Sequence, residues 1–191
     1  MKRIFTEEAR FDNQNFNKNP LNTGDYENCT FINCNFSDND LSDINFSDCE
    51  FIGCNLSLVK LVQTSFKDVK FKNSKLLGLH FSDCNDLLFT VDFENCVLNL
   101  SSFYKLKLRK TRFKNSIINE VDFTETDLSN SVFDNCDLAK TTFKNTNLEM
   151  TDFRTSFNYS IDPVVNRIKS AKFSLSGIIG LLDKYDIDIE K

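Results

Sequence analysis

The sequence contains no tryptophan, a single histidine and only five glycines among its 191 residues. His80 lies at an outward position of the repeat described below, which favours a surface residue over a catalytic base. The glycines are scattered, so the sequence offers no glycine-rich phosphate loop. No apolar run approaches the roughly 18 residues of a membrane span, and Met1-Lys2-Arg3-Ile4 leads into charged residues rather than a signal peptide. These absences predict a cytoplasmic protein that is not an enzyme and holds no cofactor.

A large apolar residue instead recurs every five positions over most of the chain, and we call these residues the centres. A period of five fits neither the helix nor the flat strand, but it fits a solenoid in which each five-residue unit forms one side of a coil. The series changes register by two residues near 82–87. The 29 centres are Phe11, Phe16, Leu21, Tyr26, Phe31, Phe36, Leu41, Phe46, Phe51, Leu56, Leu61, Phe66, Phe71, Leu76, Phe81, Leu88, Phe93, Leu98, Phe103, Leu108, Phe113, Ile118, Phe123, Leu128, Phe133, Leu138, Phe143, Leu148 and Phe153.

The positions around each centre predict which residues face inward. Two residues before the centre the chain carries small residues such as Cys29, Ser74 and Thr126. Positions two apart in a strand share a face, so the small residue and the centre both point inward. Two residues after the centre Asn and Asp dominate, and these residues tolerate the backbone angles of a tight corner.

This pattern resembles the pentapeptide-repeat family over about residues 9–155. The resemblance implies an all-β solenoid, a right-handed quadrilateral β-helix with four pentapeptides to a coil. The 29 units then make about seven coils, and a strand spacing of about 4.8 Å gives a rod of roughly 35 Å. We expect the β-helix to occupy residues 1–158, with an outward bulge at Asn85, Asp86 and Leu87 where the register slips.

Seven cysteines raise the alternatives of a metal site or disulfides. The five-residue spacing of Cys29–Cys34 and of Cys49–Cys54 is wider than that of typical zinc sites. Every cysteine falls on the small inward position, so we expect buried core thiols and no metal.

Charge is distributed in bands along the chain. Residues 19–59 contain no Lys or Arg, and in residues 120–137 the charged residues are again all Asp or Glu. Basic belts lie at 60–75 and 105–114. One interpretation is solubility, and another is an acidic surface that meets a basic DNA-binding groove of a protein. The second interpretation names Glu120, Asp122, Glu125, Asp127, Asp134 and Asp137, extended by Asp40, Asp43 and Asp48.

Residues 159–191 leave the repeat after Ile161-Asp162-Pro163. Ser174 or Ser176 can cap a helix that runs to about Tyr185, and residues 186–189 alternate like a short strand. We expect this element to cap the open coil. Its apolar residues also predict a homodimer interface made by Leu175, Ile178, Ile179, Leu182, Tyr185, Ile187 and Ile189.

The tail extends the resemblance. The run Tyr159–Pro163, the residues Lys172-Phe173-Ser174 and the Leu-rich segment after them are similar to the C-terminal ending of bacterial quinolone-resistance (Qnr-type) proteins, as is Asn73–Leu79. That resemblance implies a dimeric acidic rod that mimics DNA, binds DNA gyrase and topoisomerase IV, and relieves quinolone inhibition. It implies no direct contact with nucleic acid or membrane. The sequence lacks the long loops of many Qnr-type proteins. The alternative is a structural or adaptor protein that binds another protein.

Overall fold

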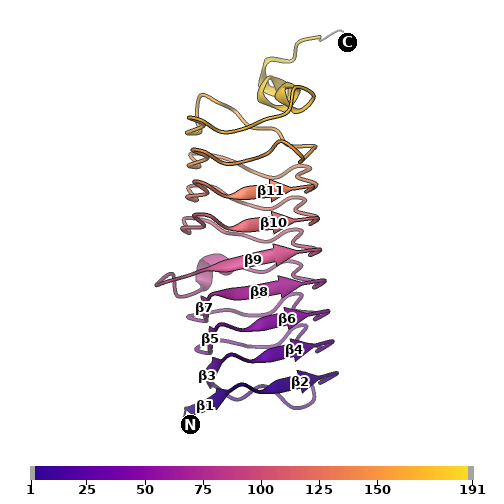
Figure 1. Cartoon of the computed structure of the whole chain (residues 1–191), viewed down its shortest axis with the longest axis vertical. Coiled ribbons are helices and arrows are strands. Elements are labelled where there is room, and N and C mark those ends of the chain that lie inside the picture. The colour runs from indigo at the N-terminus through magenta and orange to yellow at the C-terminus, as the bar shows by residue number, and fades with distance from the viewer. Residues whose placement is uncertain (1–2, 189–191) are drawn as a thin grey trace.

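The chain winds into a straight rod with its two ends at opposite tips (Figure 1). This computed structural model describes residues 3–188. All strand pairs are parallel, because each coil returns to the same side of the rod before it moves up one level. A four-stranded sheet has the order β1-β3-β5-β7, and a seven-stranded sheet has the order β11-β10-β9-β8-β6-β4-β2. The rod is therefore a right-handed quadrilateral β-helix, as the repeat predicts.

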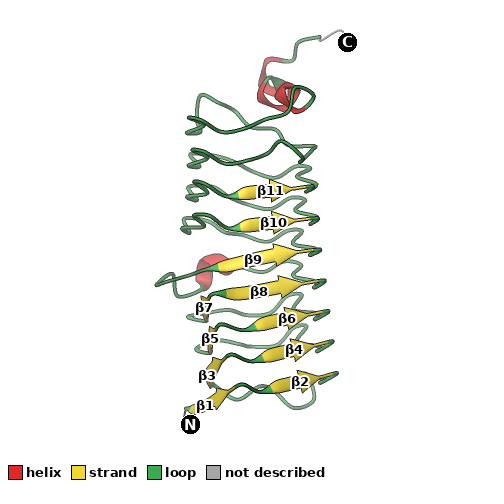
Figure 2. Cartoon of the chain, viewed as in Figure 1, coloured by secondary structure: helices red, strands yellow, loops and turns green. Residues whose placement is uncertain are grey.

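The strands are short and lie mainly on two sides of the rod, while the other sides are built of turns and isolated bridges (Figure 2). No helix among residues 3–188 is long and apolar enough to cross a membrane. The elements are β1 (Ile4–Glu7), β2 (Arg10–Asp12), β3 (Gly24–Glu27), β4 (Thr30–Ile32), β5 (Asn45–Ser47), β6 (Glu50–Ile52), β7 (Ser65–Lys67), β8 (Val69–Lys72), the 3-10 helix η1 (Phe81–Asp83), β9 (Val91–Glu94), β10 (Arg112–Lys114), β11 (Val132–Asp134), and the 3-10 helices η2 (Gly177–Leu181) and η3 (Asp183–Tyr185).

Columns of stacked rings form the core. Phe31 stacks on Phe51 with ring centroids 4.7 Å apart, and Phe113 on Phe133 at 4.6 Å with an interplanar angle of 1°. Neighbouring columns meet edge to face, which is the other favourable aromatic geometry. The centres are buried as predicted, except that Phe11 and Leu21 are half-buried and Leu88 is exposed.

The small inward residues satisfy the backbone of the coil below. The hydroxyl groups of Thr64, Thr126 and Thr151 each donate to a backbone carbonyl oxygen of the preceding coil at 2.8 Å. All seven cysteines are buried and free, as predicted, and the thiol of Cys49 points to the carbonyl of Tyr26 at 3.3 Å. Among residues 3–188 no group of three His, Cys, Asp or Glu side chains is placed to hold a metal ion.

Corners of the rod use left-handed backbone angles, as the Asn and Asp pattern predicts. Asn33, Asp48 and Asn115 have φ values of 50°, 53° and 48°. Asn and Asp reach this region at low cost, because their short polar side chains bond the local backbone. The same corner angle is nevertheless imposed on Leu58, Leu100 and Met150, which have no such adaptation.

The register change is a local protrusion between η1 and β9. Strand β6 pairs with β8 as Glu50↔Lys70, whereas β8 pairs with β9 as Lys70↔Asp92, so the coil that contains the protrusion is longer than the coil below it. The prediction that Leu88 is a centre is wrong, because its side chain is 64% exposed. Phe89 enters the core in its place and packs edge to face on Phe66 and Phe81. The Phe89 ring makes two edge-to-face contacts that a leucine side chain could not make.

The β-helix continues past residue 158, where we expected it to end. Arg167 and Lys172 bridge to Asn147 and Asp152 one coil below, and Phe173 stacks on Phe153. This final coil therefore extends the ladder to about residue 173, because Ile161 and Asn166 keep the small inward positions filled.

The expected C-terminal helix is replaced by the short 3-10 helices η2 and η3. Hydrogen bonds of the i to i+3 type close both turns, as between the Leu182 amide and the Ile179 carbonyl. Asp186 then takes a left-handed φ of 47°, which ends η3. Residues 186–188 form no strand, and Ile189 lies outside the described residues.

Candidate interaction surface

Each side of the rod is a separate surface, because equivalent residues of successive coils stack in columns, such as the bridged series Asn35, Asn55, Lys75 and Val97. We name the four sides by their buried centres. The strand face is the seven-stranded sheet. The amide face lies over Phe36, Leu56, Leu76, Leu98, Ile118 and Leu138; the acidic face over Leu41, Leu61, Phe81, Phe103, Phe123 and Phe143; and the fourth face over Tyr26, Phe46, Phe66, Leu108, Leu128 and Leu148.

The nine predicted acidic residues divide among these four sides. Asp40 and Asp122 lie on the acidic face, Asp43 and Glu125 at its corner with the fourth face, and Glu120 at its corner with the amide face. The remaining four point elsewhere: Asp48 and Asp127 on the fourth face, Asp134 on the strand face and Asp137 on the amide face. The band at 120–137 thus encircles the rod and cannot meet one partner as a single patch.

Basic residues from neighbouring coils neutralise part of this acidic set. Lys60 lies 3.1 Å from Asp40, and Lys105 lies 3.6 Å from Glu125, both pairs on the acidic face. Two further pairs of the same kind are Lys140–Glu120 at 3.8 Å and Arg109–Asp127 at 2.6 Å. Basic and acidic residues that are separated by one coil of sequence come to lie on adjacent levels, so the charges pair along the axis.

Hydrogen bonds hold two carboxylates of the acidic face, Asp122 and Asp40, at defined places. Asp122 accepts a hydrogen bond from the Thr124 amide at 2.9 Å. Ser42 and then Lys60 lower the pKa of Asp40, which keeps this carboxylate ionised. Asp43 and Asp122 have no ion-pair partner among residues 3–188, so their charge is directed to solvent.

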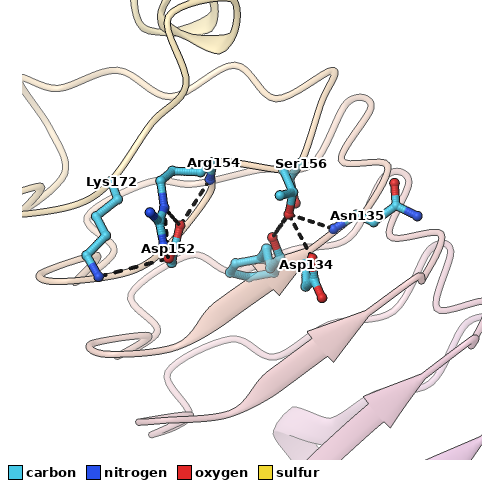
Figure 3. A network of polar contacts seen from close by, with 8 residues as sticks. Asp134, Asn135, Asp152, Arg154, Ser156 and Lys172 are labelled. Carbon is cyan, nitrogen blue, oxygen red and sulfur yellow. Dashed lines mark hydrogen bonds and ion pairs between the residues drawn. The ribbon is translucent and has the colours of Figure 1, made fainter.

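Asp134 and Asp152 on the strand face contact the next coil. Asp134 accepts a hydrogen bond from Thr155 Oγ1 at 3.0 Å at the upper edge of the strand face, close to the Asp152, Arg154 and Lys172 cluster (Figure 3). Arg154 holds the pKa of Asp152 below its usual value. These contacts give Asp134 and Asp152 a structural role between coils.

Sequence reasoning missed two acids of the acidic face and its corner. Asp83 lies at the end of η1, and its carbonyl accepts the Gln63 amide, which places it beside the column of Asp43. Asp38 is exposed at the corner that carries Glu120. Sorting the sequence by coil period rather than by contiguous bands would have found both.

A second missed feature is the column of corner residues between the amide and acidic faces, which we call the leucine corner. A ladder of amide-to-carbonyl hydrogen bonds joins each member to the next coil. Its members in order are Asp38, Leu58, Gly78, Leu100 and Glu120. Leu58 and Leu100 are 58% and 56% exposed, so large apolar side chains project from the middle of the rod.

The C-terminal tip is the other apolar surface. The Ile161 amide donates to the Gly180 carbonyl at 2.8 Å, and Leu181 packs against the core, so η2 covers the last coil. Leu175, Ile178, Ile179, Tyr185 and Ile187 are exposed, and Leu182 is half-buried. Most of the predicted dimer residues therefore lie on the outside of the tip.

Comparison with solved structures finds the same fold in proteins of different roles. Full-length QnrB1, a plasmid-mediated fluoroquinolone resistance protein, superposes with a TM-score of 0.63 at 16% identity, covering 96% of this chain and 100% of that one. HetL, a pentapeptide repeat protein involved in heterocyst differentiation regulation in the cyanobacterium Nostoc sp. strain PCC 7120, gives 0.59 at 14% identity, covering 92% and 88%.

Comparison of the sequence with curated proteins gives no significant match. The family model for the pentapeptide repeat region matches residues 24–86 and 87–158, which include the buried centres and left-handed corners described above. The chain belongs to the pentapeptide repeat family.

Proposed function

We propose that this protein is a non-enzymatic rod that binds a type II topoisomerase, DNA gyrase or topoisomerase IV, by presenting its acidic face where duplex DNA would bind. In this role it modulates the enzyme or protects it from quinolones. The C-terminal resemblance to Qnr-type proteins suggests the partner, and the acidic face is the observation that carries the proposal.

The acidic face has the charge distribution that such a contact needs. It carries Asp40, Asp43, Asp83, Asp122 and Glu125, against the basic residues Lys60, Lys105 and Lys144. Most members of the two basic belts point away from it: Lys70, Lys72, Arg112 and Lys114 lie on the strand face, and Lys67, Lys107, Arg109 and Lys110 on the fourth face. A surface that binds phosphates is basic, so it attracts this side of the rod more than the strand face, where Lys72 and Lys114 are paired with Glu50 and Glu94.

The apolar tip supports a dimer joined at its C-terminal ends. Apolar side chains clustered on one exposed end are a favourable self-complementary contact for a two-fold dimer. Two rods joined in this way would place the acidic faces on a particle twice as long as one chain.

The test compares two sets of charge removals with equal change in net charge. The first set is Asp40→Asn, Asp43→Asn and Asp122→Asn on the acidic face. The matched control is Asp48→Asn, Asp127→Asn and Asp134→Asn on the other faces. At Asp40, Asp122 and Asp127 asparagine keeps the side-chain oxygen that accepts a hydrogen bond from the backbone amide two residues later. At Asp43 and Asp48 it tolerates the left-handed corner angle.

We expect the first set to lower gyrase affinity about tenfold and the control set to have little effect, since each exposed charge pair contributes about 0.2–1 kcal/mol. Wild-type affinity should fall as salt rises, because exposed charges are screened over about 8–10 Å. A supercoiling assay with and without ciprofloxacin measures the functional consequence. Equal effects of the two sets, or affinity that is indifferent to salt, would rule out mimicry of DNA by this face.

The alternative function is an adaptor that binds another protein. The amide face favours it, because Asn35, Asn55, Asn99 and Asn119 leave this side nearly uncharged and Leu58 and Leu100 project beside it. No effect of the protein in either arm of the supercoiling assay would favour the adaptor over the topoisomerase ligand.

A further inference from the structure

Each coil of the rod forms one level of the acidic face, and successive levels expose different side chains. One level carries Asp40 and Asp43 and is followed by a level with the exposed side chain of Val62. His80 lies on the next level, Tyr104 on the one above it, and the level of Asp122 closes the series. The two acidic levels are four coils apart, or about 19 Å at the strand spacing. The three middle levels also carry Lys60, Asp83 and Lys105, so the middle of this face is mixed in charge and partly apolar.

The leucine corner borders the same levels. Leu58 shares its level with Val62, and Leu100 shares its level with Tyr104, while Asp38 and Glu120 fall on the two acidic levels. Tyr104 is held in place by Lys105, whose Nζ lies 4.8 Å from the ring centroid, and its hydroxyl points to Glu125 at 3.4 Å. The apolar side chains and the acidic levels form one continuous surface.

Leucine is a poor choice for the corner if folding alone decided the residue. Leu58 and Leu100 have φ values of 59° and 62°, where a side chain without a local hydrogen bond is disfavoured. Asn, Asp or Gly occupy many equivalent corners at no such cost. Both leucines are also more than half exposed, so core packing does not compensate the strain. Met150 shares this strain and exposure on another face, so Leu58 and Leu100 are distinguished by lying on one corner beside Val62 and Tyr104.

We propose that the leucine corner, with Val62 and Tyr104, is the anchor of the protein's interaction surface and that the two acidic levels form its rim. The partner is a protein that presents an apolar projection between two basic clusters about 19 Å apart. This inference rests on the proposed function, in which the partner is a type II topoisomerase, and it replaces uniform charge mimicry by a contact with an apolar centre.

This division of roles follows from how protein interfaces work. Central apolar and aromatic residues supply most of the binding energy, and charged residues at the rim mainly steer association. Since Lys60 and Lys105 already compensate Asp40 and Glu125, the carboxylates by themselves offer a reduced field. Duplex DNA has no comparable apolar projection on its phosphate backbone, so this surface selects a protein partner.

The test replaces both corner leucines by Leu58→Asn and Leu100→Asn and measures binding to gyrase by a kinetic method. Asparagine suits the corner angle, so thermal stability should stay equal to or above that of the wild type. The matched control is Met150→Asn, because Met150 has a φ of 58° and is 55% exposed at a corner of the fourth face.

We expect the double leucine variant to bind at least about tenfold more weakly, mainly through faster dissociation. The Met150→Asn variant should bind like the wild type, and Asp40→Asn with Asp122→Asn should mainly slow association. If the double leucine variant binds gyrase with wild-type affinity, the proposal that the leucine corner is the anchor is overturned while the proposed function stands. A wild-type protein that does not bind gyrase overturns both.

Discussion

Single residues in the core and at the corners make different contributions to this rod. Phe113 is fully buried and stacks between Phe93 and Phe133, whereas Asn115 is exposed at the following corner. The ring holds three coils together, and the asparagine sets the direction of one turn. Mutations at the two positions should therefore differ in cost although the residues are close in sequence.

The Phe113→Ala variant should lose about 3–5 kcal/mol of unfolding free energy, because it leaves a cavity in a stacked column. The Asn115→Ala variant should lose about 1–2 kcal/mol, because alanine is disfavoured at a φ of 48° and the hydrogen bond from Asn135 is lost. Urea unfolding measures both. Equal losses would contradict the assignment of inward and outward positions.

The buried thiols make stability sensitive to alkaline pH. Burial raises the pKa of Cys96 to about 11 and the pKa values of Cys49 and Cys136 to about 12. An unfolded thiol has a pKa of about 8.5, so above that pH the unfolded chain releases protons that the native state retains. The contribution of these thiols to the free energy of unfolding is therefore fully present below about pH 8.5 and decreases as pH rises toward 11.

The variant Cys96→Ser isolates one of these thiols, because serine occupies neighbouring positions of the same column at Ser74 and Ser116. Its unfolding free energy should fall less steeply with pH than that of the wild type, by about 1.4 kcal/mol per pH unit between pH 9 and 11. Urea midpoints at pH 8, 9.5 and 10.5 give the slopes. Parallel slopes for the two proteins would show that this thiol is accessible to solvent.

At the scale of elements, η2 is fitted to the last coil by a glycine. A Cβ at Gly180 would lie 2.1 Å from the Tyr159 carbonyl oxygen, which is a backbone atom that cannot move aside. The close approach permits the hydrogen bond from the Ile161 amide to the Gly180 carbonyl. The cap therefore depends on the absence of a side chain at this position.

The Gly180→Ala variant should displace η2 while the coils below remain folded, because coils contact only their neighbours. Hydrogen exchange should show faster exchange of the Ile161 amide and unchanged protection in β8–β11. Leu175→Ala is the control, since Leu175 is 89% exposed in the adjoining segment. Loss of protection throughout the rod in the glycine variant would mean that the cap is needed for folding.

At the scale of the whole molecule, the proposed side contact uses residues from separate coils, whereas the proposed dimer contact uses the single segment 175–187 at the tip. The leucine corner and acidic face run along the rod, while the apolar tip lies at its C-terminal end. A dimer joined at the tip leaves the acidic face of each chain accessible. The two contacts can therefore be disrupted independently.

Ile178→Glu with Ile179→Glu should convert a tip-to-tip dimer to monomers, because two carboxylates would be placed against an apolar partner surface. Sedimentation velocity at micromolar concentration measures this, with Met150→Glu on the side of the rod as the control. A wild-type protein that sediments as a monomer would exclude the dimer. A dimer that persists in the double variant would place the interface elsewhere.

Sequence periodicity alone predicted most of the fold. The centres, the small inward residues and the corner residues are local choices repeated at every level, and each position contacts mainly its own equivalents one coil away. Leu88 is the failure among the centres, because the protrusion is not periodic and packing against Phe66 and Phe81 selected Phe89. The prediction of a C-terminal helix was wrong for a similar reason, because the close approach of η2 to Tyr159 depends on the last coil.

The candidate surface was less predictable than the fold. By itself the sequence determined which residues are outward and therefore supplied the pool of acids from which the proposed surface is drawn. The five-residue period already puts Asp122 and Asp127 on successive sides, but only the tertiary structure decided that Arg109 neutralises Asp127. It also brought Leu58 and Leu100, which are distant in the sequence, into one exposed column. The physical reason is the coil period: neighbours in sequence turn a corner, whereas neighbours in space come from the next coil.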